Sequence, residues 1–346
     1  MVVVSLLRNL LTAKMRPWDL LVTAGVTICV FSVTGWAGRT FWILDLTSHF
    51  RVQYAVLLTV LTFAFLVKGR FRLWSNHSTP VRSEDGPSHA NRNSILAIFF
   101  AIFAALNWAL VVPRCWGEIH RPDVAGATFK VMLLNVRRQN PDTAMAIRRI
   151  AEYDPDVVVL EEIDERCWTA LSKTRATYPF QVSESREDDF GIAMLSKYPF
   201  DATTMNLRSA EVPSITAKVQ VHGKDITMMA THPLPPAGAE GTRLRNEQLR
   251  AVADFFRGTA GTKILLGDLN TTPWNHAFKD LIKDSGLIDS SRGFGYQPTW
   301  PSFLWVSNAS NSFSNDITQL CACVPLIGMP KSWPARTFEV PTQPPM

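Results

Sequence analysis

The sequence predicts an α/β protein in which a helical membrane anchor precedes a domain of β-sheets covered by helices. Two observations support this fold class. Three long stretches before Pro113 carry no charged residue, whereas short β-type runs alternate with amphipathic helices after it. Lys and Arg outnumber Asp and Glu before Pro113, but the two kinds of charge are nearly equal after it. The net charge of +5 therefore comes from the first part and gives no indication of nucleic-acid binding.

The apolar stretches predict membrane-spanning helices at about residues 20–38, 52–67 and 94–112. The first and third have the roughly 20 residues that a helix needs to cross a hydrocarbon core. The second is shorter, but Arg51 and Lys68 at its ends can extend towards the lipid headgroups. A buried hairpin of core helices is the alternative, yet the third stretch has no polar face to present to water. We therefore expect residues 1–113 to form a three-helix membrane anchor.

The distribution of Lys and Arg predicts the orientation of this anchor. These residues cluster before the first span and between the second and third, whereas only Arg39 and Arg51 lie between the first two. Because cytoplasmic loops are enriched in Lys and Arg, the N-terminus of this multi-pass cell-membrane protein should be cytoplasmic. The third span would then place the following domain on the outer side, periplasmic or extracellular. A cleavable signal peptide is disfavoured, since further spans follow the first apolar run.

The chain after Pro113 predicts a mixture of strands and helices. Strands are expected at residues 130–136, 157–160, 191–195, 215–221, 225–231 and 263–266, where short runs are rich in apolar residues. One helix is expected at 143–152 with Asp142 as its N-cap, and another at 243–256, whose apolar residues share one face. Strands mixed with helices in this way indicate sheets that helices cover.

Polar residues follow several of these strands directly. They are Asn135, Glu161, Glu162, His232, Asp268 and Asn270. Each alone has an ordinary structural explanation, because a carboxylate after a strand is commonly a solvated turn residue. Asn commonly forms an Asx turn, and a histidine at a strand end can be held by a backbone carbonyl. Their shared position at strand ends is the reason to consider them together.

Five motifs carry these residues in a fixed order. They are VMLLNV at 131–136, PDVVVLEE at 155–162, GIAMLSKYP at 191–199, THPLPP at 231–236 and ILLGDLNTTPW at 264–274. In this order they resemble the endonuclease/exonuclease/phosphatase superfamily, which has the deoxyribonuclease I-like fold. With three spans in front, the chain looks most like the bacterial membrane-anchored branch. The resemblance implies that residues 114–301 form a four-layer α/β sandwich of two mixed β-sheets flanked by helices.

The resemblance also implies roles for the strand-end residues. Asn135 and Glu162 would help to hold Mg²⁺ or Mn²⁺ at the scissile phosphate, a donor set that suits hard cations. Glu161 stands where relatives commonly have Gln, so it would be a neighbour of the metal ligand. His232 would hydrogen-bond or protonate phosphate oxygens, Asp268 would orient the attacking water, and Asn270 would donate to the developing negative charge. Water would attack in line, without a covalent enzyme intermediate.

The resemblance fails at the C-terminus. Family members end with an Asp-His pair whose His is the general base, but the last histidine here is His276, and Asp316 is followed by Ile317. Residues 302–346 are also poor in charge, and their Ser, Asn and Pro clusters are not typical of sheet strands. We hypothesise that a frameshift or truncation replaced the native C-terminus, leaving the fold incomplete there. A neighbouring reading frame without an Asp-His motif would contradict this hypothesis.

The sequence therefore predicts a membrane-anchored, metal-dependent phosphoesterase whose activity the missing motif impairs. The alternative is a non-catalytic descendant that binds a phosphorylated ligand or a partner protein. The substrate class stays open between nucleic acid, lipid headgroup and small molecule, although balanced charge disfavours duplex DNA. No obligate protein partner is expected. The five cysteines do not indicate a redox compartment.

Overall fold

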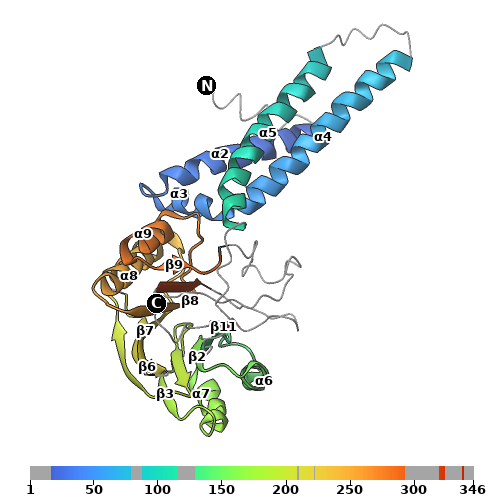
Figure 1. The fold of residues 1–346 in the computed structure, drawn as a ribbon. Helices are drawn as coiled ribbons and strands as arrows, with labels where there is room; N and C mark the ends of the chain where they lie inside the picture. Colours follow the sequence, from blue (N-terminus) through green and yellow to red (C-terminus); the bar gives the residue numbers. More distant parts are fainter. Residues whose placement is uncertain are drawn as a thin grey trace, which may run out of the picture. The chain divides into compact units, whose positions relative to one another are not determined.

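The computed structural model describes residues 17–78, 88–115, 129–208, 210–221, 223–292, 319–323 and 337–338. The chain divides into two compact units, Met1–Val112 and Pro113–Met346 (Figure 1). Each unit has a hydrophobic core of its own.

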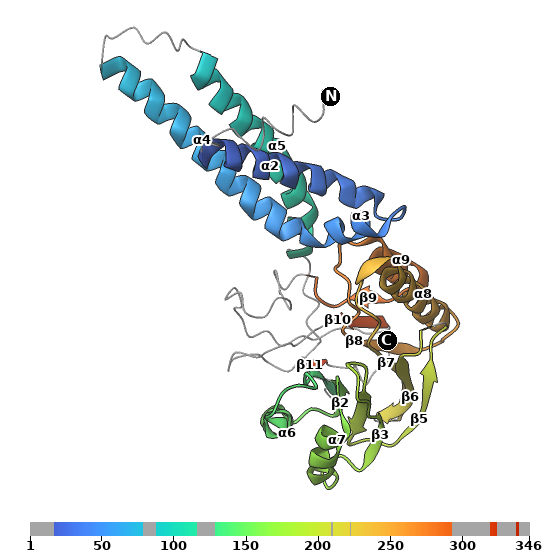
Figure 2. The same cartoon turned by 180° about the vertical axis from the view of Figure 1, so that it is seen from behind.

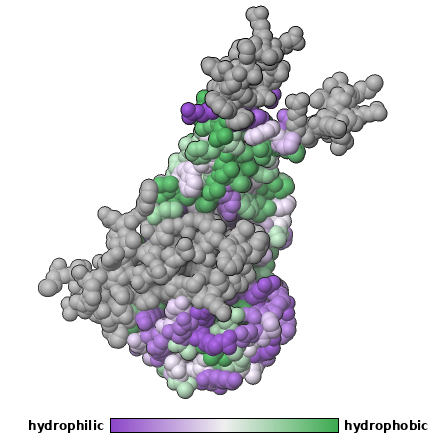
Figure 3. Space-filling model, turned by 90° about the vertical axis from the view of Figure 1, so that its right-hand side faces the viewer, coloured by the Kyte–Doolittle hydropathy of each residue, from purple (hydrophilic) through white to green (hydrophobic). Residues whose placement is uncertain are grey.

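The first unit is helical. Its helices are α2 (Pro17–Thr34), α3 (Trp42–Thr47), α4 (Arg51–Ser78) and α5 (Ser88–Cys115), with 3-10 turns η1 (Gly35–Ala37) and η2 (Ser48–Phe50). Three segments are long and apolar enough to cross a membrane, namely Pro17–Ala37, Trp42–Arg70 and Arg92–Cys115. They overlap the three predicted spans, although the second segment begins ten residues before the predicted start at 52. Large apolar side chains such as Val30, Phe63 and Ile98 are exposed, and hydrophobic surface covers much of this unit (Figure 3). A lipid environment would solvate these side chains.

A polar cluster lies in the interior of the helical unit. Arg51 is only 2% exposed and donates hydrogen bonds to the Ser32 carbonyl oxygen and to Asn107 Oδ1. Asn107 Nδ2 in turn donates to Ser32 Oγ at 2.7 Å, so α2, α4 and α5 are linked. The expectation that Arg51 reaches out to the headgroups is therefore wrong, because its donors find protein acceptors in the helix interface. Lys68 Nζ lies 3.9 Å from the centroid of the Trp18 ring, a cation-π contact.

The second unit contains two mixed β-sheets. The five-stranded sheet has the order β11-β1-β2-β4-β3, and the six-stranded sheet has the order β5-β6-β7-β8-β10-β9. The strands are β1 (Phe129–Asn135), β2 (Val157–Glu161), β3 (Phe180–Glu184), β4 (Ile192–Ser196), β5 (Phe200–Asn206), β6 (Pro213–Val221), β7 (Lys224–Thr231), β8 (Thr262–Gly267), β9 (Ile288–Asp289), β10 (Gln319–Cys323) and β11 (Thr337–Phe338). The helices are α6 (Thr143–Tyr153), α7 (Glu165–Leu171), α8 (Gly238–Arg257) and α9 (His276–Ser285), with η3 (Ser172–Thr174) after α7.

These elements form four layers (Figures 1 and 2). Alternate residues of the strands point to opposite faces, so Met228 and Ala230 of β7 join the core between the sheets. Met229, between them, packs against α8 and α9 in a separate cluster. Helices α6 and α7 contribute to the core on the side of the five-stranded sheet. The predicted α/β sandwich of two mixed sheets flanked by helices is confirmed.

The predicted strands agree with the observed ones to within two residues, and Asp142 caps α6 by accepting a hydrogen bond from Met145 N at 3.1 Å. Helices α7 and α9 and strands β3 and β5 were not predicted. The tail also differs from expectation, because β10 pairs in parallel with β8, and β11 pairs antiparallel with β1. The view that the tail lacks sheet strands is wrong for these residues. Asp316 and the rest of 302–346 lie outside the described residues, so the frameshift hypothesis stays a prediction.

Candidate active site

The ends of β1 and β2 bring Asn135 and Glu162 together. The parallel register pairs Asn135 with Glu161, so Glu162 follows immediately after the ladder. A left-handed φ of 59° at Glu162 turns the chain there, and Asn135 Nδ2 donates to Glu162 Oε1 at 2.6 Å. The backbone N–H of Arg137 donates to Asn135 Oδ1 at 3.0 Å, which fixes the other end of the same amide. Such backbone strain is common at functional sites.

Glu161 connects the two sheets. Its side chain is fully buried, and Oε1 accepts a hydrogen bond from the backbone N–H of Asp268 at 2.9 Å, at the end of β8. Among the described residues, Oε2 has no hydrogen-bond partner. Burial raises the pKa of Glu161 well above its ordinary value, and the negative charge of Asp268 raises it further. Burial therefore disfavours the charged form of this carboxyl, which lies next to Glu162 in the chain.

Gly267 makes this close approach of the sheets sterically feasible. It has a φ of 156°, and a Cβ at this position would lie 1.8 Å from the carbonyl oxygen of Thr231 and 3.2 Å from Glu161 Oε1. No residue other than Gly fits between β7 and the Glu161 carboxyl without backbone movement. The Gly of the Gly-Asp-Leu-Asn motif is therefore needed to place Asp268 beside the end of β2.

Asp268 and Asn270 form a tight turn after β8. The Asn270 backbone N–H donates to Asp268 Oδ1 at 3.0 Å, and Asn270 has a left-handed φ of 47°. Asn270 Nδ2 donates to the carbonyl oxygen of Pro233 at 2.8 Å, which ties this turn to the residue after His232. Burial raises the pKa of Asp268 from 3.8 to about 6, although the hydrogen bond from Asn270 lowers it. Asp268 thus titrates close to neutrality.

His232 is buried after the end of β7. Its ring is 4% exposed and lies 5.6 Å from the Phe190 ring, centroid to centroid. Burial lowers the pKa of His232, while the negative charges of Glu162 and Asp189 partly offset that effect. The imidazole is therefore neutral at pH 7, with one N–H donor. Among the described residues, its buried Nδ1 has no hydrogen-bond partner.

The five predicted site residues, or their neighbours in the chain, thus belong to one network of hydrogen bonds. Asn135 donates to Glu162, and the Asp268 N–H donates to Glu161, the residue before Glu162. The Asn270 N–H donates to Asp268, and the Asn270 side chain donates to the carbonyl oxygen of Pro233, the residue after His232. The structure brings together residues from the ends of β1, β2, β7 and β8, four strands of two sheets. Their catalytic and metal-binding roles remain predictions.

Helix α8 supports this network with residues that the sequence reasoning missed. Arg245 is fully buried, and its Nη1 donates to the backbone carbonyl of Asn270 at 3.1 Å. Gln248 is also buried and donates from Nε2 to Thr231 Oγ1 at 3.0 Å, and that hydroxyl shares a 2.7 Å hydrogen bond with Ser214. Spacing could have revealed them, because both lie on the same helix face as the predicted apolar residues. Buried polar side chains on such a face usually have specific partners.

The oxygen donors suit a sparse cation site. The described residues contain no group of three His, Cys, Asp or Glu side chains placed to hold a metal ion. Mg²⁺ typically binds through one or two carboxylates and keeps several waters and substrate oxygens. The Glu162 carboxylate with the adjacent Asn135 amide fits that pattern, since both oxygen-bearing groups lie at one strand end. These residues could hold a hydrated hard cation, but they do not supply enough ligands to surround a cation with protein atoms alone.

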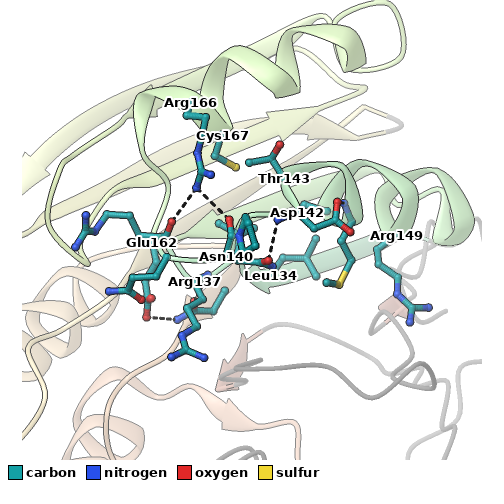
Figure 4. Close-up of a pocket in the computed structure, with 16 residues that line it drawn as sticks. Leu134, Arg137, Asn140, Asp142, Thr143, Arg149, Glu162, Arg166 and Cys167 are labelled. Atoms are coloured by element: carbon teal, nitrogen blue, oxygen red, sulfur yellow. Dashed lines mark hydrogen bonds between the residues drawn. The ribbon is translucent and has the colours of Figure 1, made fainter.

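A pocket of about 400 Å³ begins at the same two residues (Figure 4). Its walls come from the loop between β1 and α6, from α6, and from the start of α7. Asn135 and Glu162 line one end, and four arginines contribute to the walls, namely Arg137, Arg138, Arg149 and Arg166. The pocket is therefore continuous with the candidate cation site.

Two face-to-face mixed sheets with this polar set at their strand ends define a protein of the deoxyribonuclease I-like superfamily. The profile of the Endonuclease/Exonuclease/phosphatase family matches residues 132–315, more than half of the chain. The chain belongs to this family. Family membership supports a hydrolase that acts on phosphate esters.

Several solved structures are similar to part of this chain. Sphingomyelinase C from Streptomyces griseocarneus is 21% identical, with a TM-score of 0.40 over 46% of this chain and 70% of that one. A humanized D. rerio TDP2 is 20% identical, with a TM-score of 0.39 over 46% of this chain and 71% of its own. A beta toxin mutant from Staphylococcus aureus with bound magnesium ions is 19% identical, with a TM-score of 0.36 over 47% and 71%. Among curated proteins, none matches this sequence.

Proposed function

We propose that this chain is a membrane-anchored, divalent-metal-dependent phosphoesterase that hydrolyses a phosphodiester or phosphomonoester by in-line attack of water. The observation that supports this proposal is the chain of hydrogen bonds that brings Asn135, Glu162, Asp268 and Asn270 together with Pro233, the residue after His232. A solely structural role would not require oxygen and nitrogen donors from four strand ends to converge in this way.

Glu162 and Asn135 are the proposed cation ligands. A bound Mg²⁺ or Mn²⁺ would supply Lewis-acid polarisation of the phosphoryl group and neutralise charge. Asn135 is held for this task by hydrogen bonds at both ends of its amide, from Arg137 N and to Glu162 Oε1. The hydrogen bond between Asn135 and Glu162 keeps the carboxylate at the strand end and limits its rotation.

The remaining three residues act on the phosphate and the water. Neutral His232 presents a ring nitrogen to a phosphate oxygen, because burial keeps its pKa low. Asp268 orients the attacking water, and its pKa of about 6 lets it accept a proton near neutral pH. Asn270 stabilises the developing charge on the phosphoryl oxygens, as a preorganised amide donor would. The turn from Asp268 to Asn270 keeps these two groups at a fixed separation.

The missing Asp-His pair limits the expected rate. A general base typically contributes about 10² to 10⁴ in rate, so a chain without one should be slow unless Asp268 takes over part of the proton transfer. The absence of the pair from the sequence also keeps a second function open, in which the domain binds a phosphorylated ligand without hydrolysing it. Slow hydrolysis that needs Asp268 supports the enzyme, whereas binding without any hydrolysis supports the non-catalytic alternative.

The helical unit is proposed to be a three-span membrane anchor with a cytoplasmic N-terminus and the phosphoesterase domain outside. Three sufficiently long apolar segments and their exposed apolar side chains support this arrangement. Alkaline phosphatase fused after residue 128 should be active, because it folds only outside the cytoplasm. Inactive fusions there, together with active fusions after residue 80, would reverse the proposed orientation.

The test of the enzyme uses the full chain in lipid nanodiscs. Hydrolysis of bis(p-nitrophenyl) phosphate should require Mg²⁺ or Mn²⁺ and should be lost in Glu162→Ala and Asp268→Ala. Glu165→Ala and Asp201→Ala are the matched controls, since each removes an exposed carboxylate away from the network. Full activity in Glu162→Ala or Asp268→Ala would refute the site.

A further inference from the structure

The arginine-lined pocket beside Asn135 and Glu162 is not used by the proposed reaction. It has a volume of about 400 Å³, within the range of small-molecule sites. Four arginines line it against only two carboxylates, those of Asp142 and Glu162. Both carboxylates are engaged, the first as the cap of α6 and the second with Asn135. The pocket therefore carries an excess of positive charge next to the proposed cation site.

Two of the arginines hold the wall in place. Arg166 Nη2 donates to the carbonyl oxygens of Arg138 and Asn140, both at 3.0 Å, so it fastens the loop after β1 to α7 (Figure 4). Arg138 Nε donates to Asp189 Oδ1 at 3.2 Å. These contacts make the pocket wall rigid in advance of ligand binding, which reduces the entropy lost when a ligand binds.

The other two arginines can serve a ligand. Among the residues that the structure describes, the Arg137 guanidinium makes no hydrogen bond or ion pair. Arg149 is paired on one nitrogen with Glu152, which is 56% exposed, while its own side chain is only 13% exposed. Figure 4 shows both guanidinium groups directed to the same side of the loop, one on each side of Leu134. Guanidinium groups are planar donors suited to phosphate oxygens, and both residues line the pocket.

The position of Arg137 is coupled to the candidate cation site. Its φ of 52° lies in the left-handed region, and its backbone N–H closes the turn onto Asn135 Oδ1. The same turn therefore orients a proposed metal ligand and positions Arg137 in the pocket wall. Leu134, Met145 and Cys167 give this pocket apolar surface, on which a carbon skeleton between two phosphates could rest.

We propose that this pocket binds a second phosphate group, so that the site favours substrates carrying a phosphate monoester close to the scissile phosphate. The substrate preference rests on the proposed function, whereas anion binding by the pocket does not depend on it. A nucleotide and a lipid headgroup could both supply such a group, and the experiment separates these two sources.

The binding arm measures inorganic pyrophosphate binding to the full chain in nanodiscs by calorimetry, with EDTA present. Arg137→Asn and Arg149→Gln should each weaken binding about tenfold or more, the usual effect of losing a charged hydrogen bond. Asn tolerates the left-handed conformation, so the first variant removes the charge and keeps the turn. Arg175→Gln is the matched control, since Arg175 is an exposed residue just after η3 that does not line the pocket. Its affinity should stay within about twofold of the wild type.

The kinetic arm compares substrates with and without the second phosphate. One pair is dithymidine monophosphate and its terminally phosphorylated form, and the other is vesicles of phosphatidylinositol and of phosphatidylinositol 4-phosphate. A higher kcat/KM for the doubly phosphorylated member of either pair, lost in Arg137→Asn, supports the pocket and identifies the source. Pyrophosphate binding without any hydrolysis would support the anion-binding pocket and contradict the proposed enzymatic function. Unchanged pyrophosphate binding in both arginine variants, with no substrate preference, would overturn the pocket.

Discussion

Replacing Asp268 with Asn should stabilise the domain at neutral and alkaline pH while abolishing hydrolysis. Burial raises the pKa of Asp268 from 3.8 to about 6, so folding opposes its ionisation. Below pH 3.8 the carboxyl is protonated in the folded and unfolded states, so burial of Asp268 does not lower the unfolding free energy. As pH rises to about 6, the carboxyl ionises in the unfolded state but not in the folded state, and the penalty in unfolding free energy grows. A shift of about two units corresponds to about 3 kcal/mol of unfolding free energy above pH 6. Asn removes this penalty, and its amide oxygen can still accept the Asn270 N–H.

The assay is thermal unfolding of the full chain between pH 3.5 and pH 8, with EDTA present to exclude divalent cations. About 3 kcal/mol should raise the melting temperature of Asp268→Asn by roughly 6 to 12 °C at pH 8, with the difference vanishing near pH 3.5. Asp201→Asn is the control, because it changes the same charge at an exposed strand position. A melting difference that does not vary with pH, or a less stable Asp268→Asn at pH 8, would refute the burial argument.

Three further outcomes are expected. Gly267→Ala should destabilise the domain by about 3 kcal/mol or more in thermal unfolding, because its Cβ would overlap the Thr231 carbonyl. Gly223→Ala, at a positive φ with nothing within 4 Å, should lose only about 1 to 2 kcal/mol; equal losses would contradict the packing argument. The kcat/KM of any hydrolysis should fall as pH drops below about 6, where Asp268 becomes protonated, and a rate independent of pH from 5 to 8 would exclude Asp268 as proton acceptor. Asn107→Leu should lower the stability of the helical unit in detergent titrations by about 1 to 3 kcal/mol, because Arg51 loses an acceptor; an unchanged midpoint would show that the bond contributes nothing.

The fold was predictable where local pattern and burial agree. The strands β1, β2, β4 and β8 contain continuous apolar runs whose residues are buried, and such runs are visible in a sequence. Strand β5 alternates between half-buried and exposed residues and contains Asp201 and two Thr residues, so its apolar signal is weak. Helix α7 has only seven residues, too few for a periodic pattern to emerge. Pairing of β10 and β11 depends on partners far away in the chain, which local pattern cannot indicate.

The sequence allowed the strand-end residues to be named as candidates, but not the contacts that join them. The resemblance supplied the strand-end residues, and their order along the chain fixed which of them to consider. The bridge from Glu161 to Asp268 could not be foreseen, because it depends on the approach of two sheets at Gly267. The pocket behind Asn135 depends on side-chain directions in the loop after β1, and four nearby arginines in a sequence do not by themselves indicate a cavity.

The inward-facing Arg51 has a consequence for the biogenesis of the protein. Its acceptors lie on α2, which is made earlier, and on α5, which is made later. In the proposed membrane anchor, a guanidinium that enters the bilayer with α4 would lack one of its acceptors until α5 leaves the ribosome. The three helices should therefore lock together only at the end of insertion, and a nascent chain cut after residue 78 should remain loosely held and open to quality-control proteolysis.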